Sequence, residues 1–293
     1  MFPAWMRTQY LTGSARLAGV IGWPIAQSRS PRLHGFWLDR HGIDGAYVPL
    51  AVPPDHLAAV VRGLASTNFA GLNVTVPYKQ MAVGLCDEVA PFARRVGAVN
   101  MLTFREGRIT GSNSDGFGFT ENLRAHGVDP GAGPALLLGA GGAARAIAAA
   151  LQDAGAAVTV VNRTRAAADA LAADLPGVRV EDWSARWAAL DGQALLVNTT
   201  TLGMTTMPPL DPDLSRAAAG LAVVDIVYAP LETQLLHVAR AAGLRTVGGI
   251  GMLLHQARPG FATWFGVEPT VDEALERHVL GRDTRGRDVP GAA

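Results

Sequence analysis

The segment from Ala135 to Ala150 constrains the fold more strongly than any other part of the sequence. Four apolar residues, Ala135 to Leu138, lead directly into the run G-A-G-G-A-A, which opens an alanine-rich stretch. A strand, a glycine turn and a helix in this order form the G-x-G-x-x-A pattern of a dinucleotide-binding βαβ unit, because the glycines let the backbone approach a pyrophosphate at the helix N-terminus. The pattern predicts a dinucleotide site that includes Gly139, Ala140, Gly141, Gly142 and Ala143.

The residues after the next apolar strand indicate which dinucleotide binds. Asn162 follows this strand, 23 positions after Gly139, where an NAD site carries Asp or Glu to accept a hydrogen bond from the ribose 2′-hydroxyl. This chain instead has Asn162, Arg163, Thr164 and Arg165, with no carboxylate and two guanidinium groups that can meet a 2′-phosphate. The sequence favours NADP over NAD, although a solvated turn would also explain the two arginines.

Short β-branched runs alternate with helical stretches along the chain, which is typical of parallel α/β architecture. With 293 residues, 49% of them hydrophobic, the chain is long enough for about two domains with buried cores. Strands are predicted at 17–21, 46–50, 72–76, 135–138, 158–161, 195–198 and 223–225, a hairpin at 101–105 and 108–111, and helices at 31–41, 54–64, 166–173, 252–265 and 271–280.

Charge and cysteine content exclude several classes of protein. The 25 basic and 25 acidic residues balance, and the longest basic run is Arg94-Arg95, so no nucleic-acid or anionic-membrane surface is predicted. Cys86 is the single cysteine, and no apolar stretch reaches the roughly 20 residues of a transmembrane helix. The seven histidines show no i, i+4 pair with a nearby carboxylate, so no metal site is predicted. We expect a cytoplasmic protein that binds small molecules.

Lys79 stands out in the composition. It is the single lysine among 25 basic residues, the other 24 being arginine. Solvated positions accept either residue, whereas a position that needs a titratable amine cannot use a guanidinium, which stays protonated at any working pH. Lys79 is therefore a candidate catalytic residue before any motif is considered.

Two hydroxyl side chains precede the helix predicted to begin at Pro31. Ser28 and Ser30, at i and i+2 beside free helix N–H groups, suit a carboxylate ligand. Taken alone, either serine is explained more simply by capping of the helix.

Further polar groups lie at strand ends and turns, where open α/β sheets bind ligands. Asn73 and Thr75 alternate along one face of the predicted strand 72–76, where polar side chains are costly unless they face a polar pocket. Asn100 ends the run G-A-V-N. Asp115 lies in Asn-Ser-Asp-Gly, which by itself is typical of a turn.

Eight ordered motifs give the chain a family resemblance. They are V-I-G-x-P-I-x-x-S-x-S-P from Val20, G-x-N-V-T-x-P-x-K from Gly71, G-A-V-N from Gly97, N-x-D-G from Asn113, G-A-G-G-A-A-R-A from Gly139, N-R-T from Asn162, N-T-T-x-x-G-M from Asn198 and G-x-x-M-L-x-x-Q-A from Gly249. Over residues 16–264 this set closely resembles the shikimate dehydrogenases.

The resemblance implies a reaction and an architecture. The reaction is the reversible, NADP-dependent reduction of 3-dehydroshikimate to shikimate in aromatic amino-acid biosynthesis. The implied α/β architecture combines a discontinuous substrate-binding α/β domain with a Rossmann-type doubly wound NADP-binding domain. We expect the first at 1–115, completed by 250–281, the second at 116–249, and a flexible tail at 282–293. A monomer or a homodimer is expected.

The resemblance also implies roles for individual residues. Ser28 and Ser30 would hold the substrate carboxylate, and Lys79 with Asp115 would contact the reacting oxygen and its neighbouring hydroxyl. The substrate pocket would be lined by Asn73, Thr75, Asn100, Tyr228 and Gln256. The cofactor site would be completed by Thr199, Met204, Ile226 and Gly249. Whether Lys79 or Asp115 moves the proton stays open, and the other nearby acids, His34 and His255, are interpreted as structural or rim residues.

Some positions depart from the family pattern. Gln27 stands where histidine is usual, Gly35 where asparagine is usual and Ser114 where threonine is usual, while Arg165 is closer to N-R-T than the usual second basic residue. These departures bear on substrate preference and cofactor affinity more than on the type of reaction. The alternatives are a quinate or aminoshikimate dehydrogenase and a catalytically silent NADP-binding sensor, and the retention of Lys79 argues against the sensor.

Overall fold

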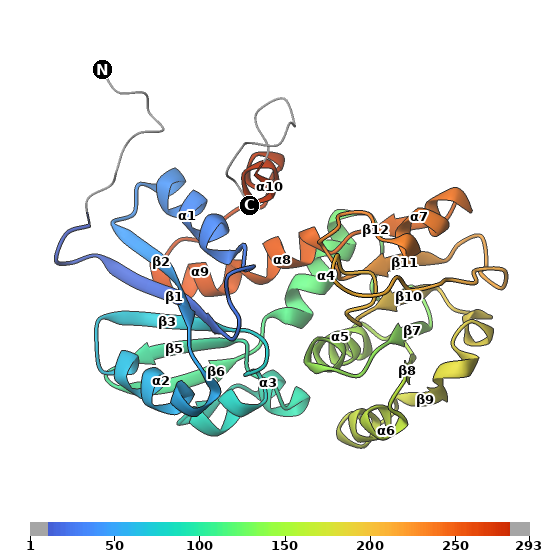
Figure 1. Ribbon diagram of the computed structural model, residues 1–293, viewed down its shortest axis with the longest axis horizontal. Helices are drawn as coiled ribbons and strands as arrows, with labels where there is room; N and C mark the ends of the chain where they lie inside the picture. The colour runs from blue at the N-terminus through green and yellow to red at the C-terminus, as the bar shows by residue number, and fades with distance from the viewer. Residues whose placement is uncertain (1–10, 282–293) are drawn as a thin grey trace. The chain divides into compact units, whose positions relative to one another are not determined.

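The computed structural model describes residues 11–281, which form two compact α/β units (Figure 1). Among the described residues, unit 1 contains residues 11–89, 99–112 and 257–281. Unit 2 contains residues 90–98 and 113–256. The tail expected at 282–293 lies outside the described residues.

Unit 1 is built on a mixed six-stranded sheet with the order β2-β1-β3-β5-β6-β4. Its strands are β1 (Arg16–Gly22), β2 (Gly45–Ala51), β3 (Phe69–Val74), β4 (Glu88–Val89), β5 (Met101–Arg105) and β6 (Arg108–Ser112). β1 pairs in parallel with β2 and β3, whereas β5 is antiparallel to β3 and β6. The predicted hairpin is confirmed, and Glu106 and Gly107 turn it with positive φ angles of 52° and 76°.

The helices of unit 1 cover both faces of its sheet. They are α1 (Ser30–His41), α2 (Leu57–Ala65), α9 (Arg258–Phe265) and α10 (Glu273–Leu280). The crossovers through α1 and α2 run in opposite directions across the sheet, so right-handed connections place these two helices on opposite faces, as Figure 1 shows. On the α1 face, an aromatic cluster joins α1 and α9 through His34, Trp37, Phe261 and Trp264.

Unit 2 is built on an entirely parallel six-stranded sheet with the order β12-β11-β10-β7-β8-β9. Its strands are β7 (Ala135–Leu138), β8 (Val158–Asn162), β9 (Arg179–Asp182), β10 (Leu195–Asn198), β11 (Ala222–Asp225) and β12 (Arg245–Val247). Its helices are α3 (Pro91–Val96), α4 (Asp115–Ala125), α5 (Gly142–Asp153), α6 (Arg165–Asp174), α7 (Gln234–Ala241) and α8 (Ile250–Gln256). The strand order reverses direction between β7 and β10, so the predicted doubly wound sheet is confirmed.

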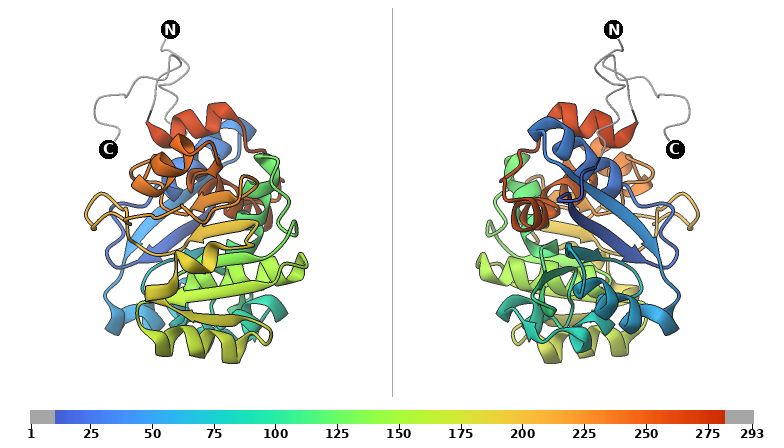
Figure 2. Two further views of the ribbon diagram at one scale, coloured as in Figure 1. Left: turned by 90° about the vertical axis from the view of Figure 1, so that its right-hand side faces the viewer. Right: turned by 90° about the vertical axis from the view of Figure 1, so that its left-hand side faces the viewer.

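Alternating residues of the parallel strands supply two cores. Leu137 of β7 and Val160 of β8 point into a core with α5 and α6, whereas Leu136 and Leu138 point into a second core with α7. Figure 2 (left) shows α6 and α7 on opposite sides of this sheet. Both faces are therefore buried, which leaves the carboxyl ends of the strands to bind ligands.

The helix predicted at 252–265 is two helices. α8 ends at Gln256 and α9 begins at Arg258, because Pro259 has no N–H to continue the helical ladder. α8 packs closely on α4 within unit 2. The two helices are so close that a Cβ atom at Gly251 would collide with the Asn122 amide. For this reason residues 250–256 group with unit 2, although we expected them in the substrate-binding domain.

Two other boundaries differ from the sequence-based expectations. Residues 90–98 group with unit 2 because α3 packs on α5, and Asn113 already belongs to that unit. The strand predicted at 72–76 runs from Phe69 to Val74, and Thr75 begins the turn that leads to Lys79.

Candidate active site

The two candidate carboxylate-binding serines lie where β1 leads into α1. Ser28 is half-buried in the loop, and Ser30 is buried as the first residue of α1. The Ser30 N–H donates to Ser28 Oγ at 3.4 Å. The capping interpretation is wrong for Ser30, because Arg29 occupies the cap position and Ser30 is the first residue of the helix.

Asn73 lies on β3 and is buried. Its Nδ2 donates to the Asn100 carbonyl oxygen at 3.2 Å, and its Oδ1 accepts a hydrogen bond from Tyr47 Oη at 2.6 Å. The Asn100 carbonyl also accepts from the Val74 N–H at 2.8 Å, so two hydrogen bonds join β3 to the G-A-V-N segment. Sequence analysis missed Tyr47, which lies in an apolar strand 26 residues before Asn73.

Lys79 lies in the turn that follows β3. The Thr75 N–H donates to the Ile21 carbonyl at 3.0 Å, and the Thr75 carbonyl accepts from Tyr78 N–H at 2.9 Å. Tyr78 is fully buried and donates its hydroxyl to the Val52 carbonyl, while the Lys79 carbonyl accepts from Val99 N–H at 2.8 Å. The backbone on either side of the Lys79 ammonium is therefore fixed, although the lysine side chain is only half-buried.

The remaining substrate and catalytic candidates belong to unit 2. Asp115 is buried at the first position of α4, and its N–H donates to Asn113 Oδ1 at 2.9 Å. Asn113 Nδ2 donates in turn to the Ala98 carbonyl at 3.0 Å, so the Asn-Ser-Asp-Gly segment is a helix start rather than an isolated turn. Tyr228 is half-buried after β11, and Gln256 ends α8 with its Nε2 donating to the Leu253 carbonyl at 3.2 Å.

The glycine turn after β7 has the features of a pyrophosphate site. Gly139 has φ of 111°, and a Cβ there would lie 2.6 Å from Thr199 Oγ1, so glycine is required by both backbone conformation and space. Thr199 donates its hydroxyl and its N–H to the Leu138 carbonyl, at 2.7 and 2.8 Å. Gly141 is exposed with open space at its Cβ position, and no side chain caps α5. The first N–H groups of α5 can therefore meet a phosphate.

The two candidate arginines after β8 differ in their surroundings. Arg165 donates to Asp169 at 2.9 Å and to Asp182 at 2.8 Å. Arg163 is exposed and has no hydrogen-bond or ion-pair partner in residues 11–281. Asn162 Nδ2 donates to the Thr164 carbonyl at 2.9 Å, which fixes this turn. Arg163 is thus the guanidinium available to a ligand.

A buried polar network that sequence analysis missed fixes the carboxyl ends of β10 and β11. Asp225 accepts hydrogen bonds from Asn198 Nδ2 (3.0 Å), the Val227 N–H (3.0 Å) and Thr233 Oγ1 (2.7 Å). Burial raises the pKa of Asp225 to about 6, and these hydrogen bonds oppose the shift. The one sequence signal was a carboxylate at the end of an apolar strand.

The last cofactor candidates lie next to this network. The Ile226 N–H donates to the Asn198 carbonyl at 3.1 Å, and a Cβ at Gly249 would lie 2.3 Å from the Ile226 carbonyl oxygen. Met204 is 38% exposed in the loop after β10, where its N–H donates to the Thr201 carbonyl at 3.2 Å. Ile226, Gly249 and Met204 thus all follow strand ends of one sheet.

The two histidines considered as alternative acids differ. His34 is fully buried, both ring nitrogens have no hydrogen-bond partner in the part of the chain that the structure describes, and burial lowers its pKa to about 3. His34 is therefore a neutral core residue. His255 lies half-buried in α8. Between residues 11 and 281, no cluster of three metal-ligating side chains occurs, and no helix is long and apolar enough to span a membrane.

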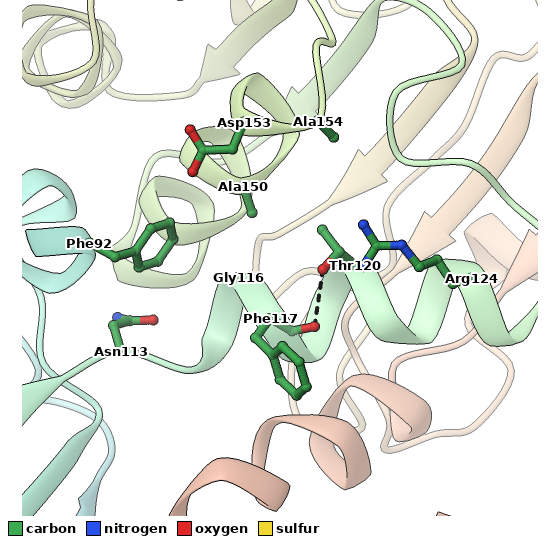
Figure 3. Close-up of a pocket in the computed structure, with 9 residues that line it drawn as sticks. All are labelled: Phe92, Asn113, Gly116, Phe117, Thr120, Arg124, Ala150, Asp153 and Ala154. Carbon is green, nitrogen blue, oxygen red and sulfur yellow. Dashed lines mark hydrogen bonds between the residues drawn. The ribbon is translucent and has the colours of Figure 1, made fainter.

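A cavity of about 310 Å³ in unit 2 contains none of the predicted site residues (Figure 3). It is lined by Phe92, Asn113, Gly116, Phe117, Thr120, Arg124, Ala150, Asp153 and Ala154. Asp153 pairs with Arg95 at 2.6 Å and Arg124 with Glu121 at 2.9 Å. Both charged groups of the lining are already neutralised by a neighbour, so the cavity offers no strong electrostatic recognition of a ligand.

Comparison with known proteins gives consistent matches. Residues 20–102 match the model of the shikimate dehydrogenase substrate binding domain, and residues 131–191 match that of shikimate / quinate 5-dehydrogenase. A shikimate dehydrogenase (NADP(+)) from Acidiphilium cryptum is 65% identical over 92% of this chain and 97% of its own length.

Two solved structures show the same fold. Shikimate 5-dehydrogenase from Thermus thermophilus, in complex with NADP(H) and shikimate, superposes with a TM-score of 0.80 at 38% identity, over 91% of this chain and 98% of the other. Quinate dehydrogenase from Corynebacterium glutamicum, in complex with NAD, superposes with a TM-score of 0.85 at 30% identity, over 91% and 99%. The identities and the extent of these matches show that the chain belongs to the shikimate dehydrogenase family.

Proposed function

We propose that this protein is an NADP-dependent shikimate dehydrogenase that catalyses the reversible reduction of 3-dehydroshikimate to shikimate. The observation that carries the proposal is the 65% identity to the Acidiphilium relative over 92% of the chain. The candidate carboxylate, hydroxyl and proton-transfer groups are all present, and Lys79 is the single amine of the sequence.

Ketone reduction requires a hydride donor and a proton donor. When bound, the reduced nicotinamide supplies the hydride. Lys79 supplies the proton to the reacting oxygen or stabilises its negative charge, and Asp115 accepts a hydrogen bond from the neighbouring hydroxyl. Ser28 and Ser30 hold the carboxylate, while Asn73, Thr75, Asn100, Tyr228 and Gln256 orient the ring hydroxyls.

The residues of unit 2 fit NADP. The uncapped start of α5 and the open space above Gly141 accommodate a pyrophosphate, and the exposed Arg163 guanidinium can pair with a 2′-phosphate. No carboxylate occupies position 162 to accept from an unmodified 2′-hydroxyl. These features support NADP rather than NAD.

The direct test is an assay of the purified chain with shikimate and NADP, read by the absorbance of reduced nicotinamide. Quinate and NAD are measured in parallel. We expect kcat/KM for shikimate to exceed that for quinate by roughly 5- to 150-fold, because the extra hydroxyl of quinate would be buried without a partner beside Ser28 and Ser30. Turnover with neither acid would contradict the proposal and favour a catalytically silent NADP-binding sensor.

A second candidate activity is supported by the fold match to the Corynebacterium quinate dehydrogenase. Gln27 and Gly35 alter the surroundings of the two serines and could reshape the carboxylate pocket toward quinate or aminoshikimate. A kcat/KM ratio near one, or one that favours quinate, would make this the better assignment. In either case we propose a cytoplasmic enzyme that acts on small molecules as a monomer or a homodimer.

A further inference from the structure

Tyr47 contacts one of the candidate substrate-binding residues, Asn73. It lies on β2 and is 7% exposed, and its hydroxyl donates to Asn73 Oδ1 at 2.6 Å. Tyr47 and Asn73 are 26 residues apart in the sequence, so this contact depends on the order of strands in the sheet.

The strand register explains how the phenol reaches Asn73. β1 lies between β2 and β3, and Tyr47 is in register with Ala18, which is in register with Gly71 of β3. The Ala18 side chain is small, so the Tyr47 ring can pass over β1 toward the strand beyond it. The Tyr47 ring stacks on His34 with centroids 3.8 Å apart and planes 3° from parallel, which fixes its orientation.

The hydrogen bonds can run in one direction only. The Asn100 carbonyl is an acceptor, so the amide nitrogen of Asn73 must face it and the amide oxygen must face Tyr47. Tyr47 therefore donates its single proton to Asn73. Tyr47 and Asn73 thus donate in one direction, and this pair of hydrogen bonds ends at the Asn100 carbonyl.

A purely structural role does not explain the hydroxyl. A buried hydroxyl costs stability unless it is hydrogen-bonded, and phenylalanine would fill the same space in the aromatic cluster without that cost. The group that accepts the Tyr47 hydroxyl proton is the side chain of Asn73, a candidate substrate contact.

We propose that Tyr47 is a positioning residue that fixes the hydrogen-bond orientation of Asn73 for the substrate. This inference rests on the proposed function. Tyr47 touches no reacting atom. With the Asn73 oxygen held by Tyr47 and one amide proton held by Asn100, the second amide proton of Asn73 is directed to a substrate oxygen.

The test is Tyr47→Phe, which keeps the ring and removes the hydroxyl. We expect KM for shikimate to rise about tenfold, with KM for NADP and kcat each changed less than about twofold, because binding of one substrate is affected and the chemistry is not. Trp37→Phe is the matched control. It removes the hydrogen bond from Trp37 Nε1 to the Thr270 carbonyl (2.9 Å) in the same aromatic cluster, and should lower Tm without raising KM for shikimate.

A double-mutant cycle with Asn73→Ala shows whether the effect passes through Asn73. We expect Tyr47→Phe/Asn73→Ala to have the KM of Asn73→Ala within about twofold. Tyr47→Phe alone leaves the buried Asn73 amide oxygen without a donor, which can impair folding. The double variant has no such oxygen, so its KM can be compared with that of Asn73→Ala even where Tyr47→Phe folds poorly.

The outcomes separate this inference from the proposed function. A wild-type protein that does not oxidise shikimate with NADP would contradict the proposed function and the role of Tyr47 in it. If the wild type oxidises shikimate, two results would overturn only the role of Tyr47. One is an unchanged KM in Tyr47→Phe, and the other is a double variant whose KM rises by the product of the two single-variant changes.

Discussion

Lys79 is a single amine held in a turn by backbone hydrogen bonds on both sides. Lys79→Met should lower kcat about 10²- to 10⁴-fold with a smaller change in KM, because a positioned proton donor contributes about this much to catalysis. Steady-state kinetics with shikimate and NADP measure both constants. Retention of more than about a third of wild-type kcat would remove Lys79 from the mechanism.

Lys79→Arg separates the two roles left open for this residue. Arginine keeps the positive charge but cannot release a proton at working pH. If Lys79 transfers the proton, the arginine variant should lose about as much kcat as the methionine variant. If Lys79 only stabilises negative charge on the reacting oxygen, the arginine variant should retain much of the activity.

His34 makes the stability of the fold depend on pH. Its pKa is about 3 in the folded state against 6.5 for an unperturbed histidine, because burial disfavours the charged ring. Between these two values the unfolded chain binds a proton that the folded chain does not, so stability falls as pH falls below 6.5, by about 1.4 kcal/mol per pH unit. Above pH 6.5 this contribution does not change.

His34→Phe isolates this effect, because phenylalanine fits the aromatic cluster and does not titrate. The measurement is the free energy of unfolding of both proteins by denaturant between pH 4 and 8 (roughly the range in which the histidine of the unfolded chain titrates). Asp225, whose pKa of about 6 gives the opposite dependence, is present in both proteins and cancels in the difference. A pH-independent difference would show that His34 is not neutral in the fold.

At the scale of elements, the turn between β8 and α6 separates two arginines that look equivalent in the sequence. Arg163→Ala should weaken NADP binding roughly ten- to a hundredfold and leave NAD binding almost unchanged, because hydrogen bonds to charged groups contribute about 1.5 to 3 kcal/mol. Arg165→Ala should have the smaller effect on NADP, since Asp169 and Asp182 already share its charge. Titration of both cofactors against both variants measures this.

Two results of that titration would count against the assignment. Equal weakening of NADP and NAD in Arg163→Ala would show that Arg163 is structural, and the preference for NADP would then lack support at this turn. A larger loss of NADP affinity in Arg165→Ala would show that the ligand displaces the two aspartates from Arg165.

At the scale of the whole molecule, the cofactor should stabilise the chain selectively. NADP at about 100 times its Kd adds about 2.7 kcal/mol to the stability of the unit that binds it. For a chain of this size we expect a rise in Tm of roughly 5 °C with NADP, and a rise of less than about 2 °C with NAD at the same concentration. Calorimetry measures the shift, and equal shifts with the two cofactors would contradict the NADP preference.

The elements that the sequence predicted well are formed by contiguous residues. β7, the glycine turn and the start of α5 follow one another within a few residues, and the φ of Gly139 and the apolar run before it are local properties. The hairpin of β5 and β6 is local in the same way, because Glu106 and Gly107 supply its turn. Patterns of this kind carry their own conformational preference, so they can be interpreted without knowledge of the rest of the chain.

The sequence by itself determined the doubly wound sheet, the dinucleotide turn and the candidate status of Lys79, because strand pattern, glycine spacing and amine chemistry are properties of short segments. Only the tertiary structure decided that Tyr47 reaches Asn73 across β1, that Asp182 holds Arg165, and that α8 packs with α4. Each of these contacts joins residues 17 or more positions apart. Strand order and helix packing set such contacts, and no local pattern encodes which distant side chain a polar group will meet.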